Sequence, residues 1–266
     1  MKKLSFFAVA LAAMVFTACG GNKKAQTVEE QEVKSFEQEQ VEASVKMHLD
    51  SLAASVAELK QLPFVREGEN GLQLTEEEKQ VKPDYLADPA IADNAATLAE
   101  KYRMISILGV DKRIAALYDM PVDDYTNAIT KLISETADPA FKEATNGSTI
   151  LEISKTLYDQ MEANGRINFY WQLVATSLVE ELFIATQNTD KFLSVFDDDA
   201  ADKVSYRVVL VTDAVSRMAE YDPDFEPVAK AVEPLKVINA ISVDQLREQI
   251  AQAKEGIVAA RQALVK

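Results

Sequence analysis

The segment Arg166–Asn188 is the most apolar stretch in the body of the chain, and it constrains the fold more than any other feature. Aromatic and aliphatic residues occupy most of its positions, interrupted by Asn168, Gln172, Glu180 and Glu181. A helix that is apolar on all sides belongs in a protein core or in a membrane, and these polar residues disfavour a membrane span. We therefore expect one central helix over Arg166–Asn188, covered by other helices.

The rest of the chain also has helical periodicity. Between Val41 and Pro63, for example, apolar residues recur at steps of four and three, which is the spacing of one helix face. We expect further helices over 41–62, 90–108 with an extension to 118, 122–136, 150–163, 198–221 and 242–265, and one short or broken helix within 223–239. No segment alternates with period two for long enough to predict a strand. The sequence thus predicts an all-α fold, a multi-helix bundle.

An internal similarity divides the predicted helical domain, residues 41–266, into two parts. At an offset of 104 residues Tyr102-Arg103 matches Tyr206-Arg207, and apolar runs follow both pairs. Either the match arises by chance, or the units 41–163 and 166–266 are pseudo-repeats that cover each other's apolar faces, as stacked helical repeats do. Residues 19–40 are polar and charged, and we interpret them as a tether and the start of a solvated helix.

The charge balance excludes one class of partner. The chain carries 43 acidic and 28 basic side chains, a formal net charge of −15, which is the wrong sign for binding phosphate backbones. We therefore expect no nucleic-acid partner. Hydrophobic residues make up 48% of the chain and charged residues 27%, which is typical of a globular protein and not of a disordered one.

The first nineteen residues have the pattern of a secretory leader. Lys2 and Lys3 precede the apolar run Leu4–Ala18, which is too short for a transmembrane helix of roughly twenty residues. The sequence Phe16-Thr17-Ala18-Cys19 resembles the lipobox of bacterial lipoproteins, although Phe16 stands where that family usually has Leu. The resemblance implies that residues 1–18 are a signal peptide cut after Ala18, and that Cys19 is lipidated, including a palmitate-type acyl chain. The alternative is an ordinary signal peptide with Cys19 beyond the cut.

The same resemblance implies a location. Gly20, rather than Asp, follows Cys19, which by the lipoprotein sorting rules favours the outer membrane. Lys23-Lys24 stand where some Bacteroides-type lipoproteins have an acidic surface-export tract, so we expect the periplasmic face. The body is similar in a general way to uncharacterised all-helical lipoproteins of such bacteria. Several acyl chains bury enough methylene groups for a stable anchor, so the membrane is an expected partner through Cys19.

Four charged residues are the candidate site residues of the body. Arg103 and Arg207 begin apolar runs, and a guanidinium there must reach water or find a carboxylate. Glu180 and Glu181, on the most apolar predicted helix, are the expected partners. These residues therefore form structural ion pairs or, alternatively, the two arginines hold an anionic ligand in a cleft between the two helical units.

Catalytic and metal-binding chemistry lacks the residues that it requires. His48 is the only histidine, it borders an apolar stripe, and serines on its own helix do not converge on it as a catalytic triad must. The EF-hand-like spacing from Asp222 fails because Pro227 replaces the required glycine, so we interpret Asp222 as a helix cap. Once Cys19 is lipidated no thiol remains. We therefore expect no metal, no cofactor and no catalytic residue.

Three function classes remain open after these exclusions. The first is a non-catalytic protein that binds another envelope protein or a cell-envelope component through its helical surface. The second is a small-ligand binding protein with a cleft between the two units, and the third is a carboxylate-dependent hydrolase. The chain contains no P-loop, no G-x-S-x-G and no H-E-x-x-H motif, so the sequence favours a protein that is not an enzyme.

Overall fold

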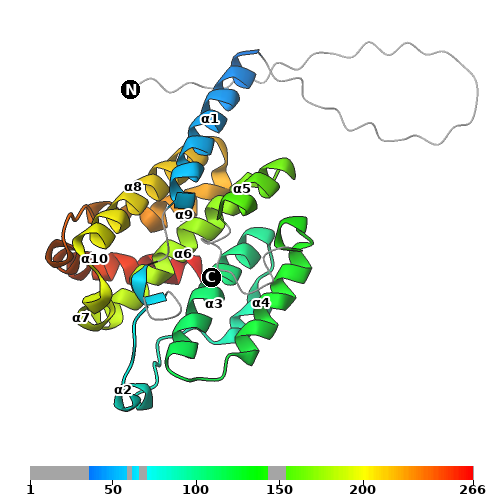
Figure 1. Ribbon diagram of the computed structural model, residues 1–266. Coiled ribbons are helices and arrows are strands. Elements are labelled where there is room, and N and C mark those ends of the chain that lie inside the picture. Colours follow the sequence, from blue (N-terminus) through cyan, green and yellow to red (C-terminus); the bar gives the residue numbers. More distant parts are fainter. Residues whose placement is uncertain (1–35, 59–61, 66–70, 143–153, 266) are drawn as a thin grey trace, which may run out of the picture.

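The computed structural model describes residues 36–58, 62–65, 71–142 and 154–265 of the chain (Figure 1). Every regular element in these ranges is an α-helix or a 3₁₀ helix, and none of these residues forms a strand. The predicted all-α class is therefore confirmed. The predicted leader, Cys19 and the tether as far as residue 35 lie outside the described residues.

Helix α6 (Ile167–Gln187) forms the centre of the bundle, and all its residues from Tyr170 to Thr186 are buried. Four longer helices pack around it (Figure 1): α3 (Leu98–Leu117), α5 (Ser154–Ala163), α8 (Asp198–Tyr221) and α10 (Val243–Leu264). The prediction of a central buried helix is confirmed. Within the described ranges, none of the helices combines the length and the apolar composition that crossing a membrane requires.

Two further helices form an outer shell. Helix α1 (Phe36–Glu58) packs on α8 and α5, and it buries Leu49, Leu52 and Val56 of the predicted apolar stripe. Helix α4 (Asp123–Thr136) packs on α3 at the other side of the bundle (Figure 1).

Short helical turns make the remaining connections. They are η1 (Pro63–Val65), α2 (Glu76–Gln80), η2 (Pro89–Asn94), η3 (Pro139–Lys142), α7 (Thr189–Phe192), η5 (Leu193–Val195), η6 (Pro223–Phe225), α9 (Glu226–Val232) and η7 (Glu233–Val237). The broken helix predicted within 223–239 is thus three short pieces, η6, α9 and η7. Each piece has a proline in its first two positions, where a missing N–H costs no helical hydrogen bond.

The predicted start of the helix over 90–118 is wrong. Asp88 and Pro89 begin the 3₁₀ helix η2, which ends at Asn94, and the long helix starts afresh after Thr97. The Thr97 hydroxyl accepts the N–H of Glu100, while the Glu100 carboxylate accepts the N–H of Thr97, which is a complete capping box. From there α3 runs without a break through Gly109 to Leu117, so the longer of the two predicted ends is correct.

Other helix ends follow their sequence signals. A capping box of Thr75 and Glu78 opens α2, and the side chains of Asp197 and Ser242 cap α8 and α10. Helix α10 approaches η7 closely at Gly256, where an added Cβ would lie 2.4 Å from the Cβ of Pro234.

Candidate functional site

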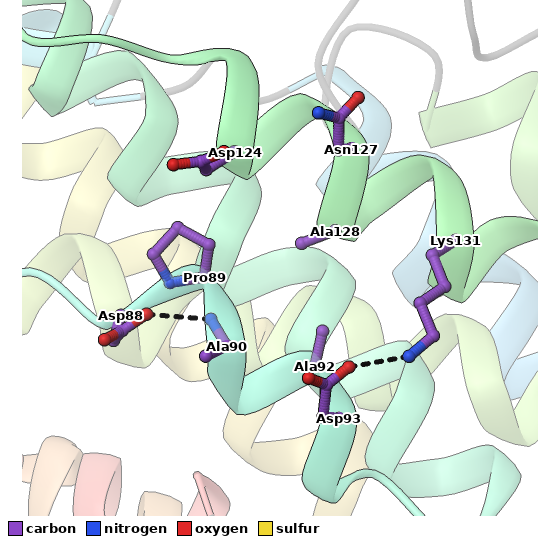
Figure 2. Close-up of a pocket in the computed structure, with 9 residues that line it drawn as sticks. All are labelled: Asp88, Pro89, Ala90, Ala92, Asp93, Asp124, Asn127, Ala128 and Lys131. Atoms are coloured by element: carbon purple, nitrogen blue, oxygen red, sulfur yellow. Dashed lines mark hydrogen bonds and ion pairs between the residues drawn. The ribbon is translucent and has the colours of Figure 1, made fainter.

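A pocket of about 370 Å³ lies between η2 and the outer helix α4 (Figure 2). It is lined by Asp88, Pro89, Ala90, Ala92, Asp93, Asp124, Asn127, Ala128 and Lys131. Its place in the chain follows from two local signals, the Asp-Pro start of η2 and the acidic first turn of α4. Both contributing elements fall within residues 41–163, so this pocket differs from the cleft expected between the two helical units.

The rim of this pocket is mainly acidic. Figure 2 shows Asp88 and Asp124 near Pro89 at one end, and the ion pair of Asp93 with Lys131, 2.6 Å, at the other. The Asp93 carboxylate raises the pKa of Lys131. Among the described residues, the Asp124 side chain has no hydrogen-bond or ion-pair partner. The pocket therefore presents net negative charge over a floor of small apolar side chains, which favours a ligand with a positive group.

A second, smaller pocket of about 230 Å³ lies between α1 and α5. Its lining includes Asp50, Tyr158 and Glu162 together with two alanines of α1. The Tyr158 hydroxyl donates a hydrogen bond to Asp50, and Lys46 pairs with both Asp50 and Glu162. These charged groups mostly satisfy one another and hold α1 against α5.

Arg207 and Glu181 form an ion pair in the core. The Arg207 Nη1 lies 2.6 Å from the Glu181 Oε2, with the side chains 1% and 0% exposed. The Ser177 hydroxyl donates to the other carboxylate oxygen of Glu181 at 3.2 Å. From the sequence we expected arginine–glutamate pairs but did not assign which glutamate contacts which arginine. The buried geometry of Arg207 and Glu181 is that of a structural ion pair, the first of the two alternatives.

Arg103 and Glu180 do not pair, which corrects the expectation for these two residues. The Arg103 Nε donates to the carbonyl oxygen of Leu264 at 3.1 Å, and its Nη1 lies 3.4 Å from the amide oxygen of Gln172. In the described part of the chain no carboxylate lies within ion-pair distance of Arg103. Glu180 pairs instead with Arg261 of α10, whose Nε lies 3.0 and 2.9 Å from the two carboxylate oxygens.

Sequence reasoning missed Arg261 and its second acidic neighbour, Asp111 of α3. The carboxyl groups of Asp111 and Glu180 are both fully buried, and Arg261 Nη2 lies 3.7 Å from Asp111 Oδ2. The Arg261 guanidinium also lies over the ring of Phe183, 4.2 Å from its centre. The one available signal was the position of Asp111, directly after the largely apolar stretch Met104–Val110.

The carboxyl pair is not placed for catalysis. General acid–base chemistry requires the carboxyl group within hydrogen-bond reach of a substrate or of a bound water. Asp111 and Glu180 have no exposed surface, and neither lines the two pockets described above. The geometry therefore gives this buried pair no role in a carboxylate-dependent hydrolase.

His48 lies at the contact between α1 and α8. Its Nε2 is 2.6 Å from Asp213 Oδ2, and the same oxygen lies 3.2 Å from Arg217 Nε. Burial alone would raise the pKa of Asp213, but the hydrogen bonds from His48 and Arg217 outweigh it and lower that pKa. The side chain of His48 is 37% exposed, so His48 is a partly buried residue that joins α1 to α8 through its contact with Asp213. The described residues contain no group of three acidic, histidine or cysteine side chains that could hold a metal ion.

The residues matched at the offset of 104 have different surroundings. Tyr102 is fully buried and donates a hydrogen bond to Asp138, whereas Tyr206 is 49% exposed. Arg207 has a carboxylate partner and Arg103 has a carbonyl partner. The matched positions therefore do not play equivalent roles in the fold, and the internal duplication stays a prediction.

Fold and geometry together define an all-α helical bundle with an acidic surface pocket and a core that contains ion pairs. Comparison of the chain with family models, with curated proteins and with solved structures gives no match.

Proposed function

We propose that this chain is a bacterial lipoprotein, anchored through Cys19 to the periplasmic face of the outer membrane, with a non-catalytic binding or scaffold role in the envelope. The observation that carries the proposal is the order of the first nineteen residues: two lysines, a short apolar run, and Ala18-Cys19.

The non-catalytic role is supported by where the reactive side chains lie. The carboxyl groups in the core, those of Asp111, Glu180 and Glu181, are fully buried. His48 has a carboxylate neighbour, but none of the described residues places a nucleophile against it. These groups can stabilise a fold, and a fold with an acidic surface can bind a partner of opposite charge.

The anchor is tested by replacing Cys19 with alanine in cells that receive a labelled fatty acid. The wild-type chain should take up label and partition into the detergent phase, and Cys19→Ala should do neither. Gly21→Ala, two residues further along, is the matched control and should behave as wild type. Equal labelling of wild type and Cys19→Ala would refute the lipoprotein assignment.

The periplasmic location and the partner need separate measurements. Protease added to intact cells should leave the chain uncut, and the same protease should cut it once the outer membrane is permeabilised. Reversible cross-linking in cells, followed by purification of the anchored chain, should recover a discrete envelope partner. Cleavage in intact cells would place the chain on the outer surface.

A second candidate function is binding of a small cationic ligand in the pocket between η2 and α4. The observation in its favour is the excess of carboxylates on the rim, with Asp124 left without a partner in the described structure. NMR titration with small diamines and lysine amide should shift signals of Asp88, Asp124 and Asn127 first. Asp124→Asn should weaken this binding, whereas Asp202→Asn, an exposed change on α8, should not. A titration that shifts no pocket signal would remove this candidate.

A further inference from the structure

Two carboxyl groups and one guanidinium meet in the interior where α3, α6 and α10 come together. Asp111 and Glu180 are each 0% exposed, and the side chain of Arg261 is 16% exposed. If both acids were ionised, one positive charge would face two negative charges in a medium of low dielectric constant, where an unpaired charge is very unfavourable. The neighbouring core ion pair of Arg207 with Glu181 has one charge of each sign and therefore no excess of negative charge.

The hydrogen bonds show which carboxyl group lacks a partner. Both oxygens of Glu180 face Arg261 Nε, whereas Asp111 Oδ2 accepts the N–H of Ala87 at 2.8 Å. The Arg261 Nη2 is 3.7 Å from Asp111, too far for a hydrogen bond. Asp111 Oδ1 is buried and receives no hydrogen bond from any described donor. An ionised Asp111 would therefore leave this oxygen unsatisfied, whereas a protonated Asp111 can donate a hydrogen bond to the neighbouring carboxylate of Glu180.

We propose that Asp111 and Glu180 hold one proton between them in the folded protein, carried by Asp111 and donated to Glu180, and that this proton keeps the segment at Ala87 closed over α3. The shared proton makes the cluster neutral and leaves Glu180 as the ionised partner of Arg261. It also gives each carboxyl oxygen a hydrogen-bond partner.

The segment between α2 and α3 covers this cluster at Ala87. The N–H of Ala87 donates to Asp111, and its carbonyl oxygen accepts the hydroxyl of Tyr125 of α4 at 2.9 Å. Both backbone polar groups of this residue are thus satisfied by side chains around the cluster. Loss of the proton would leave a second negative charge beneath Ala87, and this charge would be relieved by opening the segment to water.

The electrostatic surroundings support the same assignment. The charged and titratable groups that face Asp111 are Glu180 from α6, Arg261 from α10, Tyr125 from α4 and Tyr85 from the covering segment, with Asp84 and Asp88 further out on that segment. Burial raises the pKa of Asp111 well above its usual range, and the charge of Glu180 raises it further. The hydrogen bond from Ala87 and the charge of Arg261 lower the pKa of Asp111, but burial and Glu180 outweigh them.

The sign of the pH dependence follows from this raised pKa. An acid that binds its proton more tightly in the folded state than in the unfolded state stabilises folding at low pH, and this stabilisation is lost as the pH rises toward the folded pKa. Between the usual aspartate pKa of about 4 and the folded value, the ratio of folded to unfolded protein falls about tenfold for each pH unit from this group.

Denaturant unfolding of wild type and Asp111→Asn from pH 5 to pH 9 tests the proposal. Asparagine mimics the protonated acid, because its amide can donate to Glu180 and its oxygen can accept the N–H of Ala87. The folded-to-unfolded ratio of Asp111→Asn, divided by that of wild type, should therefore rise with pH, by up to about tenfold per unit. Glu181→Gln is the matched control, a buried glutamate with a guanidinium of its own, and its ratio to wild type should not rise. A ratio for Asp111→Asn that stays below one and independent of pH would overturn the proposal.

A second measurement uses only the wild-type protein, so it does not depend on the folding of a variant. Infrared spectra of the wild-type protein at pH 7, with and without ¹³C-labelled aspartate, should contain the carbonyl band of one protonated aspartic acid, shifted by the label. In the same protein, exchange of the Ala87 amide hydrogen should speed up at the pH at which this band is lost. Absence of a labelled acid band at pH 7 would show that Asp111 is ionised and would refute the shared proton.

Discussion

Removal of the Arg207 guanidinium should strongly destabilise the fold. The structure places this side chain at 1% exposure with its Nη1 2.6 Å from Glu181, which is itself fully buried. In Arg207→Met the carboxylate of Glu181 would keep only the hydroxyl of Ser177 as a partner. A charge left alone in the core must be protonated or hydrated, and both changes disfavour the folded state.

The expected magnitude follows from the depth of burial. Breaking a fully buried ion pair by removing one partner costs about 3–5 kcal/mol. For a protein of this size that corresponds to a decrease in Tm of roughly 6–20 °C. The double variant Arg207→Met/Glu181→Leu should recover most of this loss, because an apolar pair of similar volume avoids the desolvation of both charges. The Nε and Nη2 of Arg207 have no hydrogen-bond partner among the described residues, which makes the recovery easier.

Arg103 provides the matched comparison, since it occupies the equivalent position at the offset of 104. It is partly buried, and it donates to the Leu264 carbonyl oxygen and to Gln172. Arg103→Met should therefore cost only about 1.5–3 kcal/mol, the scale of a hydrogen bond that involves a charged group.

Thermal unfolding and urea titration of the four proteins, wild type included, measure these differences. Two equal and large losses for the single variants would show that the two arginines are equivalent and would contradict the surroundings described above. A neutral or stabilising Arg207→Met would refute the argument from burial.

Four other perturbations test the fold and the expectation that the chain binds no metal. Gly256→Ala should destabilise the fold by about 1–3 kcal/mol, because the added Cβ overpacks against Pro234. Gly109→Ala, where the added Cβ meets no atom within 4 Å, should stabilise it by about 0.5–1 kcal/mol. Equal melting temperatures for the two variants would contradict the close approach of α10 and η7. Thr97→Ala should cost about 1 kcal/mol by removing the cap of α3, and a circular-dichroism melt identical to wild type would show that this cap contributes nothing. Calcium should leave the Tm unchanged, because Pro227 lies within α9 where an EF-hand loop needs glycine; micromolar binding by calorimetry would contradict this.

Local signals in the sequence determined most of the secondary structure. The apolar run around Trp171 sufficed to predict the central helix, because only a helix buried on all sides accommodates such a run. Ser242 caps α10, whose bounds match the helix predicted over 242–265. The start of α3 was missed although Thr97 and Glu100 form a capping box, since Ala95 and Ala96 before it fit a continuous helix equally well.

The partners of the buried charges were decided by the tertiary structure. Burial on α6 required Glu180 and Glu181 to find cations, and this much follows from the cost of an isolated charge in a core. Adjacent residues on a helix point about 100° apart, so the two glutamates face different neighbours. Glu181 meets Arg207 of α8, while Glu180 meets Arg261 of α10 and, beside it, Asp111 of α3. Which helices pack against those two faces depends on the arrangement of the whole bundle, and no local pattern of residues contains it.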